Sequence, residues 1–173
     1  MRIALFVCTG NSCRSVMAKA VCEQLLRERG MLGGAPSSSI DPTKRIYVMS
    51  AGVSAVNGMS ATFETRSVLR NIGLDISGHR SAHLTEDMIR HAELLLVMEE
   101  AHRNDIIRRV PEAASKVFLL RAFGLESPGT AEMDSTILDP IGKPLEVYET
   151  CLATIREAVE RVVQHLERSC ASP

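Results

Sequence analysis

The sequence predicts an α/β protein, a three-layer sandwich in which helices flank a central four-stranded parallel sheet. Short apolar runs alternate with segments in which apolar residues recur at helical spacing, as in chains built from parallel strands and covering helices. The chain has 173 residues, of which 45% are hydrophobic, so it can bury the core of one ordinary domain. Because no linker or internal repeat divides it, we expect residues 1–173 to form a single domain.

The elements follow from the two kinds of apolar pattern. Strands are expected where the apolar runs are short and unbroken, at residues 2–8, 45–50, 94–98 and 116–120. Helices are expected where apolar residues recur every three or four positions, at residues 15–29, at 60–71, from residue 85, at 99–110 and at 148–166. Gly73 follows the second of these helices as a stop signal, and Thr85 opens the third as an N-cap.

Two stretches show neither pattern. Residues 31–44 are rich in Gly, Ser and Pro with little to bury, and we expect them to form a flexible surface insertion. Residues 121–144 are also interrupted by Gly and Pro. Because so long an irregular loop inside a domain is usually functional, we expect it to contribute to a site.

The candidate site lies in the turn after the first strand, because open parallel sheets bind ligands at the carboxyl ends of their strands. Successive amides that curl around one point form an anion cradle, to which the positive end of the following helix adds. Gly10 and Asn11 tolerate the positive φ angles that such a turn requires. The phosphate-binding residues expected are Thr9, Gly10, Asn11, Ser12, Cys13, Arg14 and Ser15.

Three side chains are the candidates for catalysis. Cys8 ends the strand at the helix N-terminus beside a guanidinium, an environment that favours the nucleophilic thiolate over the thiol. Arg14 offers a planar fork that can hold two oxygens of a tetrahedral oxyanion. Asp139, stiffened by Pro140 in the 121–144 loop, is the candidate acid for a leaving group. A cysteine at a strand end is often only a buried hydrophobe, but its place between a strand and a helix favours the chemical interpretation.

Composition narrows the possible partners and location. The net charge of −1 and the 3% aromatic content disfavour nucleic acid and anionic membranes as ligands. No apolar run reaches the roughly 18 residues that span a bilayer, and the N-terminal run lacks the cleavage site of a signal peptide. Five unevenly spaced cysteines do not suggest a disulfide framework, so we expect reduced thiols in a cytoplasmic protein.

Residues 7–18 resemble the phosphate loop of the low-molecular-weight protein tyrosine phosphatase family, which includes bacterial protein arginine phosphatases. The resemblance continues through residues 50–52, residues 73–80 and the pair Asp139–Pro140. It implies a phosphatase that acts on a phosphorylated protein or peptide and needs no cofactor and no metal. Cys8 would form a phosphocysteine, Arg14 would clamp the oxyanion, and Asp139 would act as general acid and then as general base.

The resemblance also assigns supporting and substrate-binding residues. Ser15 would hydrogen-bond the thiolate, and Asn11 would hold the loop with help from Ser50 and His79. Cys13 corresponds to a second loop thiol that can pair with Cys8 and protect it from over-oxidation. Two further residues would line the substrate slot, namely Ser12 and Ile141.

The substrate stays open between phosphotyrosine and phosphoarginine. Ile141 stands where an aromatic wall residue is common, and Ser12 replaces the bulky residue of tyrosine-specific members. Both features open the slot, as in the arginine phosphatase branch, although a serine at position 12 also occurs in other branches.

The sequence disfavours three other interpretations. An arsenate reductase of the same fold needs two further cysteines downstream of the loop, but none lies between Cys22 and Cys151. A non-hydrolytic phosphocysteine carrier would use a similar loop, but it needs neither Arg14 nor Asp139, and this sequence has both. His79 and His83 lack the further ligands of a zinc site. The remaining histidines, among them His102, are expected at the surface.

Overall fold

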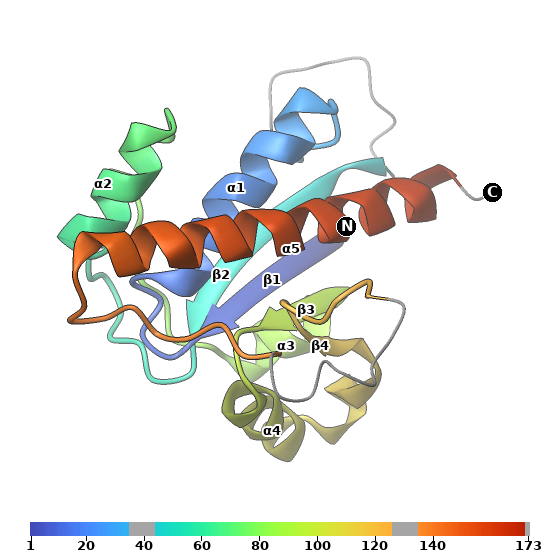
Figure 1. Cartoon of the computed structure of the whole chain (residues 1–173). Helices are drawn as coiled ribbons and strands as arrows, with labels where there is room; N and C mark the ends of the chain where they lie inside the picture. Colours follow the sequence, from blue (N-terminus) through green and yellow to red (C-terminus); the bar gives the residue numbers. More distant parts are fainter. Residues whose placement is uncertain (35–43, 126–134, 172–173) are drawn as a thin grey trace.

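The computed structural model describes residues 1–34, 44–125 and 135–171, and within them it confirms the α/β sandwich. The sheet has four parallel strands in the order β2-β1-β3-β4, and β1 lies inside it (Figure 1). The strands are β1 (Arg2–Cys8), β2 (Ile46–Gly52), β3 (Leu94–Val97) and β4 (Val117–Leu119). The loop that leaves β1 therefore emerges between two neighbouring strands, at the carboxyl edge of the sheet.

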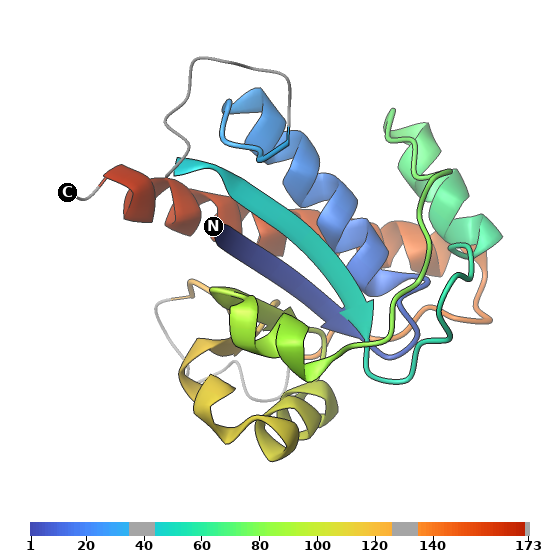
Figure 2. The same ribbon diagram turned by 180° about the vertical axis from the view of Figure 1, so that it is seen from behind.

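Helices cover both faces of the sheet, as the two views in Figures 1 and 2 show. One face carries α1 (Arg14–Glu28), α2 (Phe63–Asn71) and the long α5 (Leu145–Ala171). The other face carries α3 (Glu86–His91), α4 (Glu100–Arg109) and the short 3-10 helix η2 (Pro111–Lys116).

The side chains of β1 explain why its apolar run is unbroken. Ala4 and Phe6 belong to the core beneath α1 and α5, whereas Leu5 and Val7 belong to the core beneath α3 and α4. All four are fully buried. A strand covered on both faces has no position for a polar residue, so the continuous apolar pattern correctly predicted a central parallel strand.

Several element bounds differ from the sequence-based expectation for local reasons. Helix α2 begins at Phe63 rather than at residue 60, because the Thr62 side chain caps it by accepting from the Thr65 amide. Helix α5 begins directly after Pro144, before the first residue of its apolar stripe. The 3-10 helix η2 was not predicted. Residues 35–43 of the expected insertion and 126–134 of the irregular loop lie outside the described residues.

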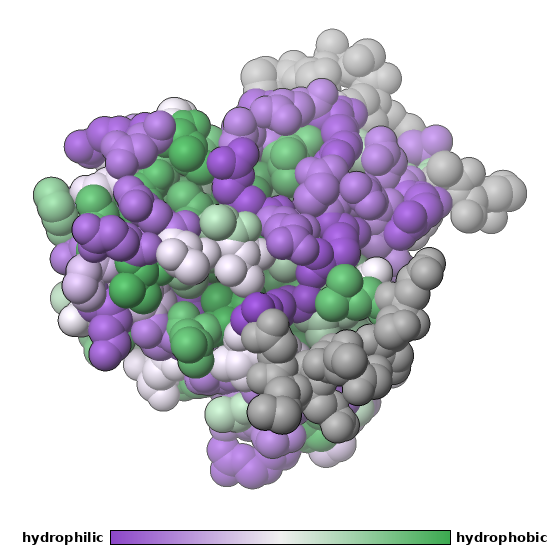
Figure 3. Space-filling model, in the orientation of Figure 1, coloured by the Kyte–Doolittle hydropathy of each residue, from purple (hydrophilic) through white to green (hydrophobic). Residues whose placement is uncertain are grey.

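Polar and apolar residues are interspersed on the face of the molecule shown in Figure 3. Among the described residues, no helix is long and apolar enough to cross a membrane.

Candidate active site

The loop between β1 and α1 is held in a tight curl by Asn11 and by the neighbouring strand β2. Asn11 has a φ of 52°, a left-handed conformation that asparagine tolerates better than most residues. The amides of Val53 and Ser54, just after β2, donate to the carbonyls of Cys8 and Thr9, each at 2.9 Å. This close approach of two backbone segments fixes the position of the loop relative to the sheet.

Cys8 and Ser15 are in contact across the curl, as predicted. Their Sγ and Oγ atoms are 3.0 Å apart and buried. Asn11 Nδ2 donates to the same Ser15 oxygen at 2.8 Å, which occupies one of its acceptor positions. The hydroxyl proton of Ser15 is therefore free to be donated to the sulfur of Cys8, as a nucleophilic thiolate requires.

The supports of Asn11 were predicted in part. His79 Nε2 donates to the Asn11 carbonyl oxygen at 2.9 Å, as expected. The side-chain oxygen of Asn11, however, accepts from the backbone amide of Ala82 at 2.9 Å. Ser50 lies on β2 opposite Phe6, and within the described part of the chain it makes no hydrogen bond to Asn11. Burial lowers the pKa of His79, and nearby Lys19 and Arg80 add to this effect.

Arg14 is the most deeply buried charge of the site, with 1% of its side chain exposed. Its Nη1 donates to the carbonyl oxygen of Ile137 at 2.9 Å, and its Nη2 donates to Asp139 Oδ2 at 2.6 Å. Its Nε is buried and has no hydrogen-bond partner among the described residues. A buried donor without an acceptor is costly, so Nε is a donor that an anion in the cradle would satisfy.

The N-terminus of α1 favours an anion more than the other α-helices do. The first turn of α1 contains no acidic residue, whereas α2, α3, α4 and α5 each begin with at least one. Acidic residues in a first turn offset the positive end of the helix dipole. The positive end of α1 is therefore not neutralised by its own side chains.

Asp139 lies at the edge of the curl and is brought there by the chain that leads into α5. Its Oδ2 contacts Arg14, and its Oδ1 accepts from the Ile141 amide at 3.2 Å. Pro140 is buried, which anchors the segment, while 37% of the Asp139 side chain remains exposed. A partly exposed carboxyl that is held beside Arg14 can exchange a proton with a bound substrate or water.

A family model described as low molecular weight phosphotyrosine protein phosphatase matches residues 3–172. The chain belongs to this family. It is therefore a cysteine-dependent phosphatase, and the three side chains predicted to be catalytic, Cys8, Arg14 and Asp139, lie together at the carboxyl edge of the sheet.

The relatives include both arginine phosphatases and tyrosine phosphatases. A protein-arginine-phosphatase of Geobacillus stearothermophilus is 35% identical over 163 residues, which cover 94% of this chain and 95% of that protein. A probable low molecular weight protein-tyrosine-phosphatase, EpsP of Ralstonia nicotianae, is 33% identical over 167 residues, which cover 96% and 97%. A solved structure of YwlE arginine phosphatase, a cysteine-to-serine mutant with a phosphorylated active-site serine, superposes with a TM-score of 0.80 at 27% identity and covers 96% of both chains.

Cys13 faces away from solvent in this low-molecular-weight phosphatase. Its Sγ lies 3.6 Å from Thr62 Oγ1 and donates to the Tyr148 hydroxyl oxygen at 3.9 Å. Tyr148 is buried, as the stripe of α5 predicted, and burial raises its pKa to about 12. Cys8 and Cys13 are both free thiols, so their pairing stays a prediction.

One prediction about the surroundings of the site was wrong. His102 was expected at the surface, but it is 2% exposed and contacts the phosphate loop. It lies one helical turn before the buried Ile106 on α4. This i, i+4 spacing is the sequence signal that could have placed His102 on the buried face of the helix.

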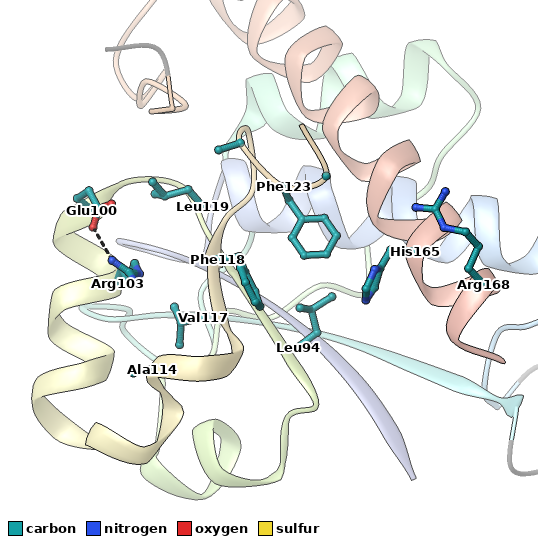
Figure 4. A pocket seen from close by; sticks show the side chains of 12 residues that line it. Leu94, Glu100, Arg103, Ala114, Val117, Phe118, Leu119, Phe123, His165 and Arg168 are labelled. Carbon is teal, nitrogen blue, oxygen red and sulfur yellow. Dashed lines mark ion pairs between the residues drawn. The ribbon is translucent and has the colours of Figure 1, made fainter. Parts of the chain in front are cut away.

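A hollow of about 490 Å³ lies apart from the phosphate loop, between β4 and the C-terminal half of α5 (Figure 4). Phe118, Phe123 and His165 line it, with edge-to-face ring contacts between Phe118 and Phe123 and between Phe123 and His165. None of the predicted catalytic or phosphate-binding residues lines this hollow.

Proposed function

We propose that this phosphatase hydrolyses phosphorylated protein side chains through a phosphocysteine on Cys8, and that phosphoarginine is its preferred substrate. The convergence of Cys8, Arg14 and Asp139 on one short loop supports the mechanism. In the first step the Cys8 sulfur attacks phosphorus, and the bond from phosphorus to the leaving nitrogen or oxygen breaks. Asp139, in its protonated form, gives its proton to that leaving atom.

Arg14 and the loop amides bind the phosphoryl oxygens during both steps. Arg14 Nε is a buried donor without a partner, and among the described residues the amides of residues 10–13 have no acceptor. Donors already in place when charge develops stabilise the transition state without reorganisation. In the second step water attacks the phosphocysteine, the phosphorus–sulfur bond breaks, and the Asp139 carboxylate accepts the water proton. Phosphate leaves and Cys8 returns to its starting form.

The slot residues support phosphoarginine. Ser12 is small and half-buried, and Ile141 offers an aliphatic wall that is 57% exposed, so neither provides an aromatic partner for a phenol ring. The carboxyl of Asp139 can also pair with a guanidinium leaving group. The arginine phosphatase relative is consistent with this preference.

Phosphotyrosine is the second candidate, because an exposed aromatic ring does lie near the loop. Phe63 is 69% exposed and follows Thr62, whose amide donates to the Ser12 carbonyl at 3.2 Å. The EpsP relative, a probable tyrosine phosphatase, is consistent with this alternative.

Two measurements test the proposal. Cys8→Ser should abolish turnover of p-nitrophenyl phosphate while inorganic phosphate still binds; turnover at the wild-type rate would exclude the phosphocysteine. The ratio of kcat/KM for matched phosphoarginine and phosphotyrosine peptides then decides the substrate. A ratio above one supports phosphoarginine, and a ratio below one transfers the proposal to phosphotyrosine.

We also infer a cytoplasmic location, since all five cysteines are free thiols. Fractionation of the producing cells tests this directly, and recovery with secreted proteins would contradict it.

A further inference from the structure

His102, a buried imidazole on α4, lies directly behind the phosphate loop. Its Nε2 lies 2.9 Å from Thr9 Oγ1 and 3.2 Å from Glu99 Oε1. Thr9 Oγ1 also accepts from Arg14 Nη2 at 3.4 Å. His102, Thr9 and Arg14 thus form a continuous chain of contacts from α4 to the catalytic guanidinium.

His102 would destabilise the folded protein relative to an apolar side chain if it only filled space at this position. Its Nδ1 is buried and has no hydrogen-bond partner within the described residues. Leaving one buried polar atom unsatisfied costs free energy that an apolar side chain of similar size would avoid. The contact made by Nε2 is the feature that an apolar side chain could not supply.

Two carboxylates that lie near His102 also contact Arg14. Glu99 Oε2 lies 3.7 Å from Arg14 Nη1, and Asp139 holds Nη2 on the other side. Burial lowers the pKa of His102, and the positive charge of Arg14 adds to this, whereas Glu99, Asp139 and Asp105 oppose it. The pKa thus lies below its ordinary value, which favours the neutral ring beside the guanidinium.

The position of the proton follows from these contacts. With the ring neutral and its proton on Nε2, His102 donates toward Thr9 Oγ1 and Glu99 Oε1, which are both acceptors. Thr9 Oγ1 then accepts two hydrogen bonds, one from His102 on α4 and one from Arg14. Since Thr9 is itself exposed, these two contacts are what hold its hydroxyl in place.

We propose that His102 is a positioning residue, which holds the guanidinium of Arg14 through the Thr9 hydroxyl in the orientation that binds a phosphoryl group. The proposal rests on the proposed function only for the identity of the ligand as a phosphoryl group. It predicts that His102 acts on phosphate binding through the hydroxyl of Thr9.

The test compares His102→Leu, which removes the Nε2 contact, with His102→Gln, whose amide can donate from a similar place. Titration calorimetry with inorganic phosphate gives the dissociation constant, and p-nitrophenyl phosphate gives kcat and KM. We expect His102→Leu to weaken phosphate binding and raise KM by about threefold to tenfold, the range of one neutral hydrogen bond. His102→Gln should stay within about twofold of the wild type, and so should the control His91→Gln, at an exposed histidine of α3.

A double-mutant cycle separates positioning from a general loss of stability. If His102 acts through Thr9, then His102→Leu combined with Thr9→Val should be no worse than the more damaging single variant. Multiplication of the two effects would overturn the proposal, and so would a His102→Gln variant as weak as His102→Leu at equal Tm.

Failure of the proposed function gives a different result. A wild-type protein that binds phosphate but does not hydrolyse p-nitrophenyl phosphate would refute the phosphatase mechanism, whereas the role of His102 would still be decided by phosphate binding.

Discussion

Gly52 is the position at which one added methyl group should most directly disturb the phosphate loop. A Cβ at this glycine would lie 2.5 Å from the Thr9 carbonyl oxygen and 2.8 Å from the Asn11 amide nitrogen. Real Cβ atoms essentially never approach closer than 3.0 Å, so in Gly52→Ala the loop backbone must retreat by several tenths of an ångström. Gly78 is the matched control, because a Cβ there meets nothing within 4 Å.

The expected loss has two parts. Overpacking against backbone costs about 1–3 kcal/mol. In a domain of this size that lowers Tm by about 2–12 °C. Because Thr9 and Asn11 belong to the cradle itself, we also expect kcat/KM for p-nitrophenyl phosphate to fall, by at most about 100-fold, since that is the scale of a full 1 Å misplacement. Thermal unfolding by circular dichroism and steady-state kinetics measure both parts. If Gly52→Ala matched Gly78→Ala in Tm and in kcat/KM, our account of the loop packing would be wrong.

Three further predictions concern proton transfer, specificity and acid stability. Asp139→Asn should slow substrates with poor leaving groups most, and an equal loss across a series of aryl phosphates would argue against its acid role. Ser12→Ile should narrow the slot and shift the kcat/KM ratio toward phosphotyrosine peptides; an unchanged ratio would show that Ser12 does not select the substrate. The lowered pKa of His79 means that the unfolded chain binds its proton first. The free energy of unfolding should therefore fall as pH drops below about 6.5, and it should fall less in His79→Gln. Curves of Tm against pH that are the same for both proteins would contradict this.

The parts of the fold that are local in sequence were predicted well. The run from Cys8 to Ser15 correctly predicted the loop between a strand and a helix, and it named Cys8 and Arg14 as the candidate nucleophile and clamp. A strand end, a turn and a helix start follow one another there without a gap. The burial of Tyr148 followed from the apolar stripe of its helix, whereas the contact between Cys8 and Ser15 was expected from the family resemblance.

Contacts made by backbone groups of distant segments could not be predicted. The Ala82 amide donates to the Asn11 side chain, 71 positions away in the sequence, and the Ile137 carbonyl accepts from Arg14 Nη1. Any residue except proline carries an amide, and every residue carries a carbonyl, so neither partner has a sequence signature. The family resemblance named Ser50 as a support of Asn11, but the group that bonds the Asn11 side-chain oxygen is the backbone amide of Ala82.

The bonds of Arg14 also determine when this protein can become active during folding. Its contacts with Ile137 and Asp139 close loops of 123 and 125 residues. Such long-range contacts form late, after the intervening strands have paired. A growing chain therefore carries Cys8 long before Asp139, and a chain cut short before residue 137 has the loop but lacks two of the groups that bind Arg14, the Ile137 carbonyl and the Asp139 carboxyl. Recovery of activity on refolding should consequently coincide with completion of the whole domain.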